Sequence, residues 1–269
     1  MARYRQSLAL TSRYSRQLER TAARVQRLAE ARWNLAPEDF DGSYSRWLDV
    51  VVPAVTQAQK QNQRLTTAYL TAFITSETGV RARLKTVGSV AGKNEDGRDL
   101  REAWDVPPIR AKQALMEGKE LPVAMDIARA SAMGLIGLGV YAGARVPMAE
   151  MLDIADETVG YTRVTGGNPC AACMGAADGT VFATDEVFEI HPSCDCVAEP
   201  VIDGVEDRVT RPTGQEVFDG LTEAEQNDRI GEAAADAVRG GTPLSDFIGH
   251  VDTNVGANWI IQRPLKDVA

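Results

Sequence analysis

The stretch NPCAACMGAADGTVFATDEVFEIHPSCDC, residues 168–196, contains all four cysteines of the 269-residue chain and one of its two histidines. Cys170 and Cys173 have the C-x2-C spacing, which lets a tight turn direct two thiolates at one tetrahedral metal ion. Cys194 and Cys196 are two residues apart, so on a strand their sulfurs would share one face. We therefore predict that these cysteines form a metal site.

The histidine of the stretch adds a fifth candidate ligand for four positions. Four soft ligands favour Zn2+, and a closed four-coordinate site leaves no position for water or a substrate, so the predicted zinc is structural. Four cysteines are the preferred set, with the histidine beside the site, and the histidine with three cysteines is the open alternative. The candidate ligands are Cys170, Cys173, Cys194, Cys196 and His191.

Other chemistries of the same stretch fit less well. An iron–sulfur cluster or a set of reduced core thiols remains an alternative, whereas disulfides are disfavoured because nothing in the sequence indicates export. Zinc nucleoside deaminases share P-C-x-x-C, but their H-x-E motif should come earlier, and neither histidine precedes Cys170. A Cys/His hydrolase needs one activated thiol rather than four clustered ones. We predict no catalytic residue and no enzyme.

Composition limits the classes of partner. The net charge of −9 argues against a protein that coats nucleic acid along its whole length. The first 20 residues are too charged for a signal peptide. The longest uncharged apolar run, residues 130–144, is shorter than the ~20 residues that span a bilayer, and its glycines would let a buried helix approach its neighbours closely. We expect a cytosolic protein without a membrane partner.

Helical periodicity dominates outside the cysteine stretch. Apolar residues recur every three or four positions from residue 2 to about 33 and again over 43–76, which predicts a long helical hairpin. Pro53 marks either a kink or the true start of the second helix. Shorter helices are expected from 108 to 118, from 121 to 144 and from 147 to 157.

Short β-branched segments surround the cysteines, and helix returns after them. YTRVT, TVFAT and CVAEPVI predict strands, with ADG as a hairpin turn, and Thr222 and Glu225 have capping-box spacing. The predicted fold class is mainly α with a small β unit. Its parts are a helical arm (1–78), a linker (79–98), a helical region (99–160), a zinc-stapled β-hairpin module (161–202) and an acidic helical tail (203–269).

The motif C-x2-C…H-P-x-C-x-C, preceded by YTRVT and followed by EPV, resembles that of the Mu F-like head morphogenesis proteins of tailed phages. The specific match covers residues 160–201, and the flanking helices are compatible with it. The resemblance implies a non-enzymatic minor capsid protein in the virion, at the portal vertex or capsid interior. Such a protein is present in the host cytoplasm during assembly and acts in head assembly or DNA delivery. The implied partners are the portal protein and the major capsid protein.

Charge suggests where such partners would bind. Residues 1–35 carry eight Arg, no Lys and two Glu, so the first helix could meet an acidic portal surface or packaged DNA. Helices of ~30 residues are longer than one compact domain covers, so we expect part of their apolar stripes to dock on a partner. The expected contacts are Leu18, Val25, Trp47 and Tyr69.

The competing hypothesis is a cytosolic zinc-ribbon protein that binds nucleic acid or a regulatory partner. A ribbon that binds nucleic acid needs a basic surface near its zinc. Residues 161–200 carry one basic residue, Arg163, against six acidic ones, which disfavours nucleic acid at the zinc module.

Overall fold

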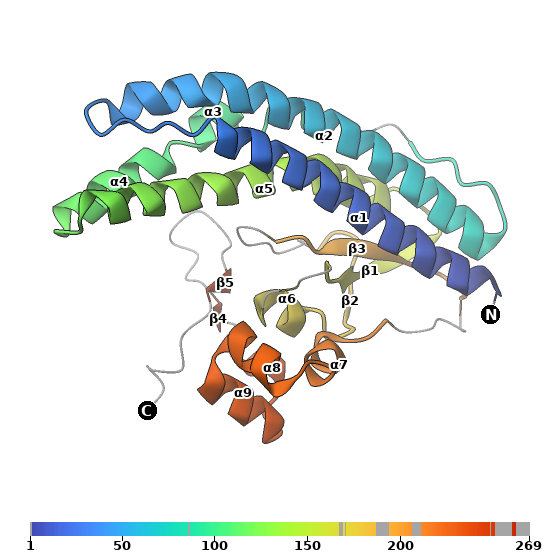
Figure 1. Ribbon diagram of the computed structural model, residues 1–269. Coiled ribbons are helices and arrows are strands. Elements are labelled where there is room, and N and C mark those ends of the chain that lie inside the picture. Colours follow the sequence, from blue (N-terminus) through green and yellow to red (C-terminus); the bar gives the residue numbers. More distant parts are fainter. Residues whose placement is uncertain are drawn as a thin grey trace. The chain divides into compact units, whose positions relative to one another are not determined.

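The computed structural model describes residues 2–85, 87–166, 169, 171–186, 194–205, 211–247, 249–250 and 260–261. Helices account for 64% of the residues and strands for 8%, which confirms the predicted mainly α class with a small β unit. In chain order the elements are α1 (Ala2–Ala31), α2 (Phe40–Thr78), α3 (Leu100–Ala103), α4 (Val106–Met116), α5 (Leu121–Asp153), β1 (Thr158–Val164), α6 (Ala171–Ala176), β2 (Val181–Phe182), β3 (Val197–Ile202), α7 (Gly214–Asp219), α8 (Glu223–Ile230), α9 (Glu232–Arg239), the 3-10 helix η1 (Leu244–Phe247), β4 (Gly249–His250) and β5 (Ile260–Ile261) (Figure 1).

The chain divides into two compact units. The helical unit consists of Gln17–Tyr69 and Lys85–Glu150, and the sheet unit consists of Met1–Arg16, Leu70–Leu84 and Met151–Ala269. The helices α1, α2 and α5 each contribute residues to both units.

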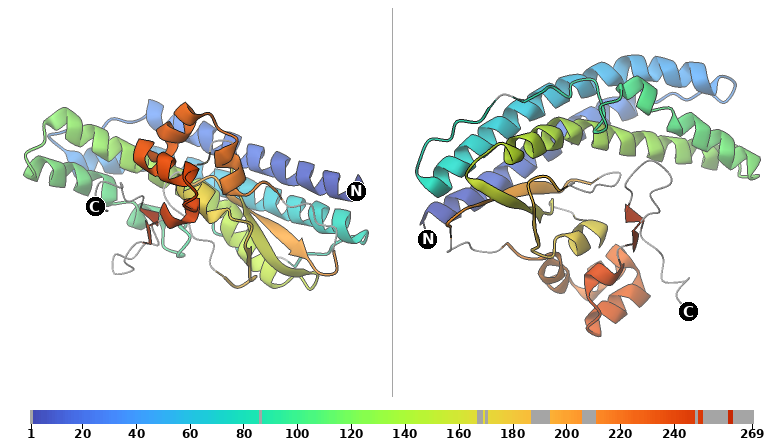
Figure 2. Two further views of the ribbon diagram at one scale, coloured as in Figure 1. Left: turned by 90° about the horizontal axis from the view of Figure 1, so that it is seen from below. Right: turned by 180° about the vertical axis from the view of Figure 1, so that it is seen from behind.

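In the helical unit, α1, α2 and α5 lie side by side (Figures 1 and 2). The indole of Trp47 donates a hydrogen bond to the carbonyl oxygen of Ala29 at 2.9 Å, which joins the predicted hairpin near its turn. Trp47, Leu18, Val25 and Tyr69 have at most 4% of their surface exposed. The prediction that these four side chains dock on a partner is therefore wrong, because the chain's own helices bury the stripes.

Polar side chains of α2 bind the backbone of α5. The amide nitrogen of Gln59 donates to the carbonyl oxygen of Gly139 at 2.8 Å, and that of Asn62 donates to Val140 at 2.9 Å. Both side chains are fully buried. A Cβ added to Gly143 would lie 2.3 Å from the Cα of Gln59, so only glycine allows this approach. The expectation that the glycines of this run permit close helix packing is confirmed.

The predicted linker has neither helix nor strand over its described residues, yet it is anchored to the helical unit. The backbone N–H of Gly92 donates to the side-chain oxygen of Gln59 at 2.7 Å, and Val90 is 6% exposed. Gly92 has φ +84°, a backbone conformation that glycine adopts without strain.

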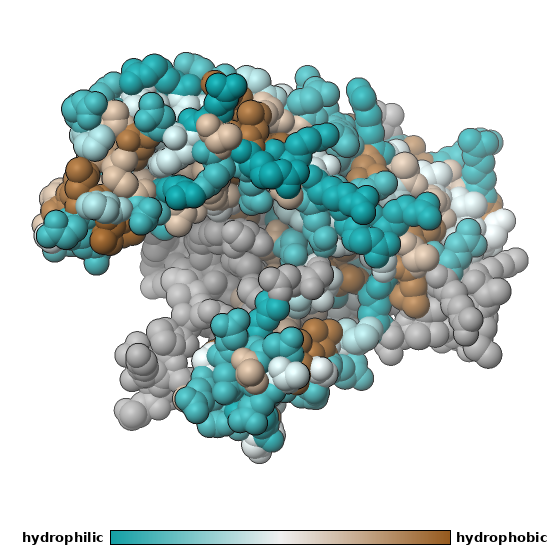
Figure 3. All heavy atoms as spheres, in the orientation of Figure 1, coloured by the Kyte–Doolittle hydropathy of each residue, from teal (hydrophilic) through white to brown (hydrophobic). Residues whose placement is uncertain are grey.

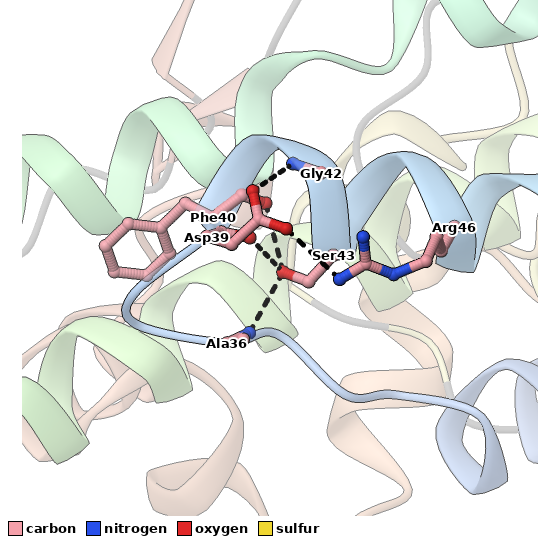
Figure 4. A network of polar contacts seen from close by, with 6 residues as sticks. All are labelled: Ala36, Asp39, Phe40, Gly42, Ser43 and Arg46. Carbon is pink, nitrogen blue, oxygen red and sulfur yellow. Dashed lines mark hydrogen bonds and ion pairs between the residues drawn. The ribbon is translucent and has the colours of Figure 1, made fainter.

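The start of α2 is fixed by Asp39 and Ser43 (Figure 4). One carboxylate oxygen of Asp39 accepts the backbone N–H of Gly42 at 3.0 Å, and the other lies 3.2 Å from the guanidinium of Arg46. The hydroxyl of Ser43 donates back to the Asp39 carbonyl at 2.6 Å and accepts the N–H of Ala36 at 2.9 Å. The bond to Asp39 satisfies the N–H of Gly42, one of the donors that the first turn of a helix leaves free, and α2 begins at Phe40, before the predicted residue 43.

Two prolines lie inside helices. Pro53 is within α2, and Pro147 is within α5, so the predicted helices 121–144 and 147–157 are one helix. Proline removes one backbone hydrogen bond, but buried residues on both sides of Pro147, Ala144 and Met148, hold α5 together. On length and apolar composition alone α5 could cross a membrane, a test that the core helix of a globular protein also passes.

The sheet unit contains a three-stranded antiparallel sheet in the order β2-β1-β3. Tyr161 of β1 pairs with Phe182 of β2 on one side and with Pro200 of β3 on the other. The helix α6 lies between β1 and β2 in sequence, so the predicted simple hairpin module is wrong in this detail. The predicted ADG turn leads from α6 into β2, with Gly179 at φ +89°.

Short helices follow the sheet. The predicted capping box of Thr222 and Glu225 is confirmed at the start of α8, and Thr213 and Glu216 form a second one at α7. Gly231, at φ +84°, separates α8 from α9. Buried residues of α6, α7, α9 and η1 share one apolar cluster: Met174, Phe218, Ala235, Val238 and Leu244.

Candidate metal centre

Three of the four cysteines meet in the interior of the sheet unit. Cys173 lies in α6, while Cys194 and Cys196 lie in the irregular segment that leads into β3, rather than on the predicted strand. Their residues are 2%, 1% and 0% exposed, respectively. The segments that carry them are more than 20 residues apart in sequence, so the fold creates this cluster.

The sulfur positions suit a tetrahedral metal ion. All three Sγ atoms lie within 4.8 Å of one another, and those of Cys173 and Cys194 are 3.8 Å apart. Zinc–sulfur bonds of about 2.3 Å in tetrahedral geometry place sulfurs about 3.8 Å apart. A disulfide would need about 2.0 Å, so Cys173 and Cys194 are not joined by one. The three buried cysteines therefore form a cluster within metal-binding distance.

The remaining candidate ligands, Cys170 and His191, lie outside the described residues. The residue before Cys170 is described: the carbonyl oxygen of Pro169 accepts a hydrogen bond from Arg229 of α8 at 3.1 Å. This bond ties the residue before Cys170 to α8. The choice between four cysteines and three cysteines with His191 stays a prediction.

A buried cation lies near the thiols. Arg163 of β1 is 9% exposed and pairs with Ala198 of β3, two residues beyond Cys196. The positive charge of Arg163 acts on the Cys196 thiol, so the two side chains are near each other. A guanidinium here offsets the negative charge that thiolates would bring into the interior.

The pKa of the Cys196 thiol reflects these neighbours. The hydrogen bond with Cys173 lowers the pKa, but the hydrogen bond with Cys194 and burial raise it, so the pKa lies well above the usual thiol value. The positive charge of Arg163 opposes the increase. Without a metal the Cys196 thiol is therefore protonated and unreactive, since the thiolate is the nucleophilic form.

The backbone around the cluster is tightly packed. A Cβ on Gly166, in the loop after β1, would lie 2.1 Å from the carboxylate of Asp195, the residue between Cys194 and Cys196 in the sequence. Tyr161 stacks on Phe182 with ring centroids 5.3 Å apart, and its hydroxyl donates to the carbonyl of Glu186 at 3.0 Å. The contacts of Tyr161 hold β2, an edge strand of the sheet, against β1.

The helix α6 also packs against residues of the C-terminal helical tail. The backbone N–H of Gly214 donates to Ala177 at 2.6 Å, and a Cβ on Gly214 would overlap the carbonyl oxygen of Met174. Met174 itself is 1% exposed in the apolar cluster with α7 and α9. The residue after Cys173 is thus anchored, which positions the thiol.

Sequence reasoning identified the cysteines but missed their supports. Nothing in the spacing of Arg163, Arg229 or Gly214 marks them, because each acts on a segment distant in sequence. One feature of the sequence could have identified Arg163: it is the sole basic residue in residues 161–200.

A search of known protein families, of curated proteins and of solved structures found no match to this chain.

Proposed function

We propose that the chain is a non-enzymatic structural protein that binds one Zn2+ at the cysteine cluster, and that it serves as a minor capsid protein of the Mu F-like class. The observation that supports the zinc site is the group of three buried sulfurs within 4.8 Å of one another. Three soft donors with a fourth from Cys170 or His191 match the structural sites that zinc occupies.

The residues present fit a structural rather than a catalytic role for the ion. Cys173 would join α6 to Cys194 and Cys196 at the entrance of β3, and four protein ligands close the coordination sphere. The described cysteines are at most 2% exposed, so a substrate has no route to them in this state. Zinc would cross-link the segments around a sheet of three short strands, which has little hydrophobic core of its own.

The assembly role follows from the motif that resembles the Mu F-like proteins. The proposed partners are the portal protein and the major capsid protein, and the proposed location is the portal vertex or capsid interior. Packaged DNA is a further proposed partner. The long helices support this role because they present extended polar surfaces while their apolar stripes are buried.

Metal analysis tests the zinc site. Full-length protein produced in zinc-supplemented medium should contain about one equivalent of zinc per chain. Cys194→Ser should abolish retention, and comparison of Cys170→Ser with His191→Gln should identify the fourth ligand. His250→Gln, at the histidine outside the motif, is the control and should keep its zinc. Metal-free wild-type protein of full stability would overturn the site.

Co-assembly tests the role. The full chain, produced together with the portal and major capsid proteins of the phage proposed to encode it, should co-sediment with procapsids in few copies. Cys194→Ser should reduce incorporation because the sheet unit is no longer cross-linked. Absence of the wild-type chain from procapsids and from purified portal would refute the assembly role and leave the zinc result unaffected.

A further inference from the structure

One face of the helical unit is strongly basic. Arg20, Arg24 and Arg27 follow one another on α1 at spacings of four and three, and all three are exposed. On α2, Lys60 and Arg64 are also exposed and four residues apart. We call these five side chains the basic face. Residues at such spacings lie on one side of a helix.

The two helices present these cations to the same side. The guanidinium of Arg24 donates to the side-chain oxygen of Gln61 at 2.9 Å, which brings α1 alongside α2 between Lys60 and Arg64. Figure 3 shows hydrophilic side chains along α1 at this surface. The five cations therefore form one patch.

Few acidic groups balance the patch. Residues 50–76 contain no Asp or Glu, and on α1 the nearest acids are Glu19, which is half-buried, and Glu30, which pairs with Arg129. Within the described part of the chain, none of the five cations takes part in an ion pair. Their charge is thus available to a partner although the whole chain has a net charge of −9.

The patch has the composition of a phosphate-binding surface rather than of a protein interface. Protein interfaces have an apolar or aromatic centre, and their charged residues lie mostly at the rim. Here Leu28, at 37% exposure, is the one exposed large apolar side chain over residues 6–31 of α1, and α2 has none after Val50. Four of the five cations are arginines, whose planar guanidinium binds phosphate bidentately.

We infer that the basic face binds the phosphate backbone of duplex DNA without sequence preference. Phosphate contacts carry no sequence information. The inference deepens the proposed function by assigning DNA to α1 and α2, and it depends on that function only for the source of the DNA. Failure of DNA binding would leave zinc retention and portal association intact, so the two proposals fail separately.

Fluorescence anisotropy with a labelled 25-base-pair duplex of random sequence tests the inference. For the full-length zinc-loaded protein, five phosphate contacts predict that affinity falls about 500-fold between 50 and 200 mM salt. Arg20→Gln/Arg24→Gln should reduce this change to about 40-fold. The matched control, Lys85→Gln/Arg110→Gln, removes two exposed charges outside the basic face and should behave as wild type.

Three results would overturn the inference. They are no duplex binding at 50 mM salt, equal loss in the control variant, and binding of polyglutamate as tight as that of DNA with the same dependence on Arg20 and Arg24. The last result would assign the basic face to an acidic protein surface. Thermal unfolding of both variants, which should match wild type because all four substituted side chains are exposed, excludes misfolding as the cause.

Discussion

The Cα of Gly143 on α5 faces the backbone of Gln59 on α2 so closely that an added Cβ would lie 2.3 Å from the Gln59 Cα. Gln59 is fully buried at this contact. The same glutamine bonds to Gly139 on α5 and to Gly92 in the linker. The contact therefore determines how near α2 and α5 approach and whether three segments of the helical unit stay joined.

Gly143→Ala should destabilise the protein by at least about 2 kcal/mol, because a methyl group here forces two helix backbones apart. Urea unfolding followed by circular dichroism would measure the loss. Gly220→Ala is the matched control: its backbone has φ −79°, and the nearest atoms to the added Cβ lie at 3.5 Å, an ordinary contact. Equal stability of Gly143→Ala and wild type would contradict this packing.

Arg163→Met should weaken zinc retention, because the buried cation near Cys196 would be lost while the bulk of the side chain remains. Loss of a supporting contact around a metal site costs roughly 10–100-fold in metal affinity. Competition with a chromophoric chelator measures the affinity. Arg163→Lys keeps the charge, so its zinc affinity should lie between that of Arg163→Met and that of the wild type. Unchanged affinity in Arg163→Met would show that the cation plays no part at the site.

Arg211→Met should destabilise the sheet unit by about 3–5 kcal/mol, since it leaves a buried carboxylate without its charged partner. Glu199 of β3 is 2% exposed and lies 2.6 Å from the guanidinium of Arg211, which also donates to the carbonyl of Leu8. Chemical unfolding measures the loss. Arg98→Met, which breaks the exposed ion pair with Asp96, should cost no more than about 1 kcal/mol. Similar costs for the two variants would disprove the importance of burial.

The capping box of α8 should respond to pH. Hydrogen bonds from the side chain and then the backbone of Thr222 lower the pKa of Glu225. The carboxylate therefore stabilises α8 above the pKa of Glu in the unfolded chain, and this contribution is lost as the pH falls through the lowered folded value. In Thr222→Ala the pKa should rise towards that of an ordinary Glu, as measured by NMR titration. Thr222→Ser keeps the hydroxyl and should leave the pKa low; an unchanged pKa in Thr222→Ala would refute the cause.

The sequence predicted most helices because their apolar spacing is local. The same periodicity located Val25 and Trp47 but could not tell whether another part of the chain covers them; α5 lies beside α1 and α2 because of glycines and buried amides that periodicity does not record. Pro147 led to the wrong prediction of two separate helices, because the packing of α5 outweighs the loss of one backbone hydrogen bond. For the candidate site, spacing identified the thiols, while Arg163 and α6 depend on pairing between distant segments.

The bonds from Gln59 and Asn62 to successive carbonyl groups of α5 have a mechanical consequence. Aliphatic side chains lose little when one helix slides along another, because most neighbouring apolar surfaces are equivalent. Two buried amides do not tolerate a shift by part of a turn, since it would leave both amides without their carbonyl acceptors and out of reach of water. These two bonds therefore fix the axial register of α2 against α5. A force applied along the helices would be transmitted through the helical unit rather than lost when one helix slides along the other.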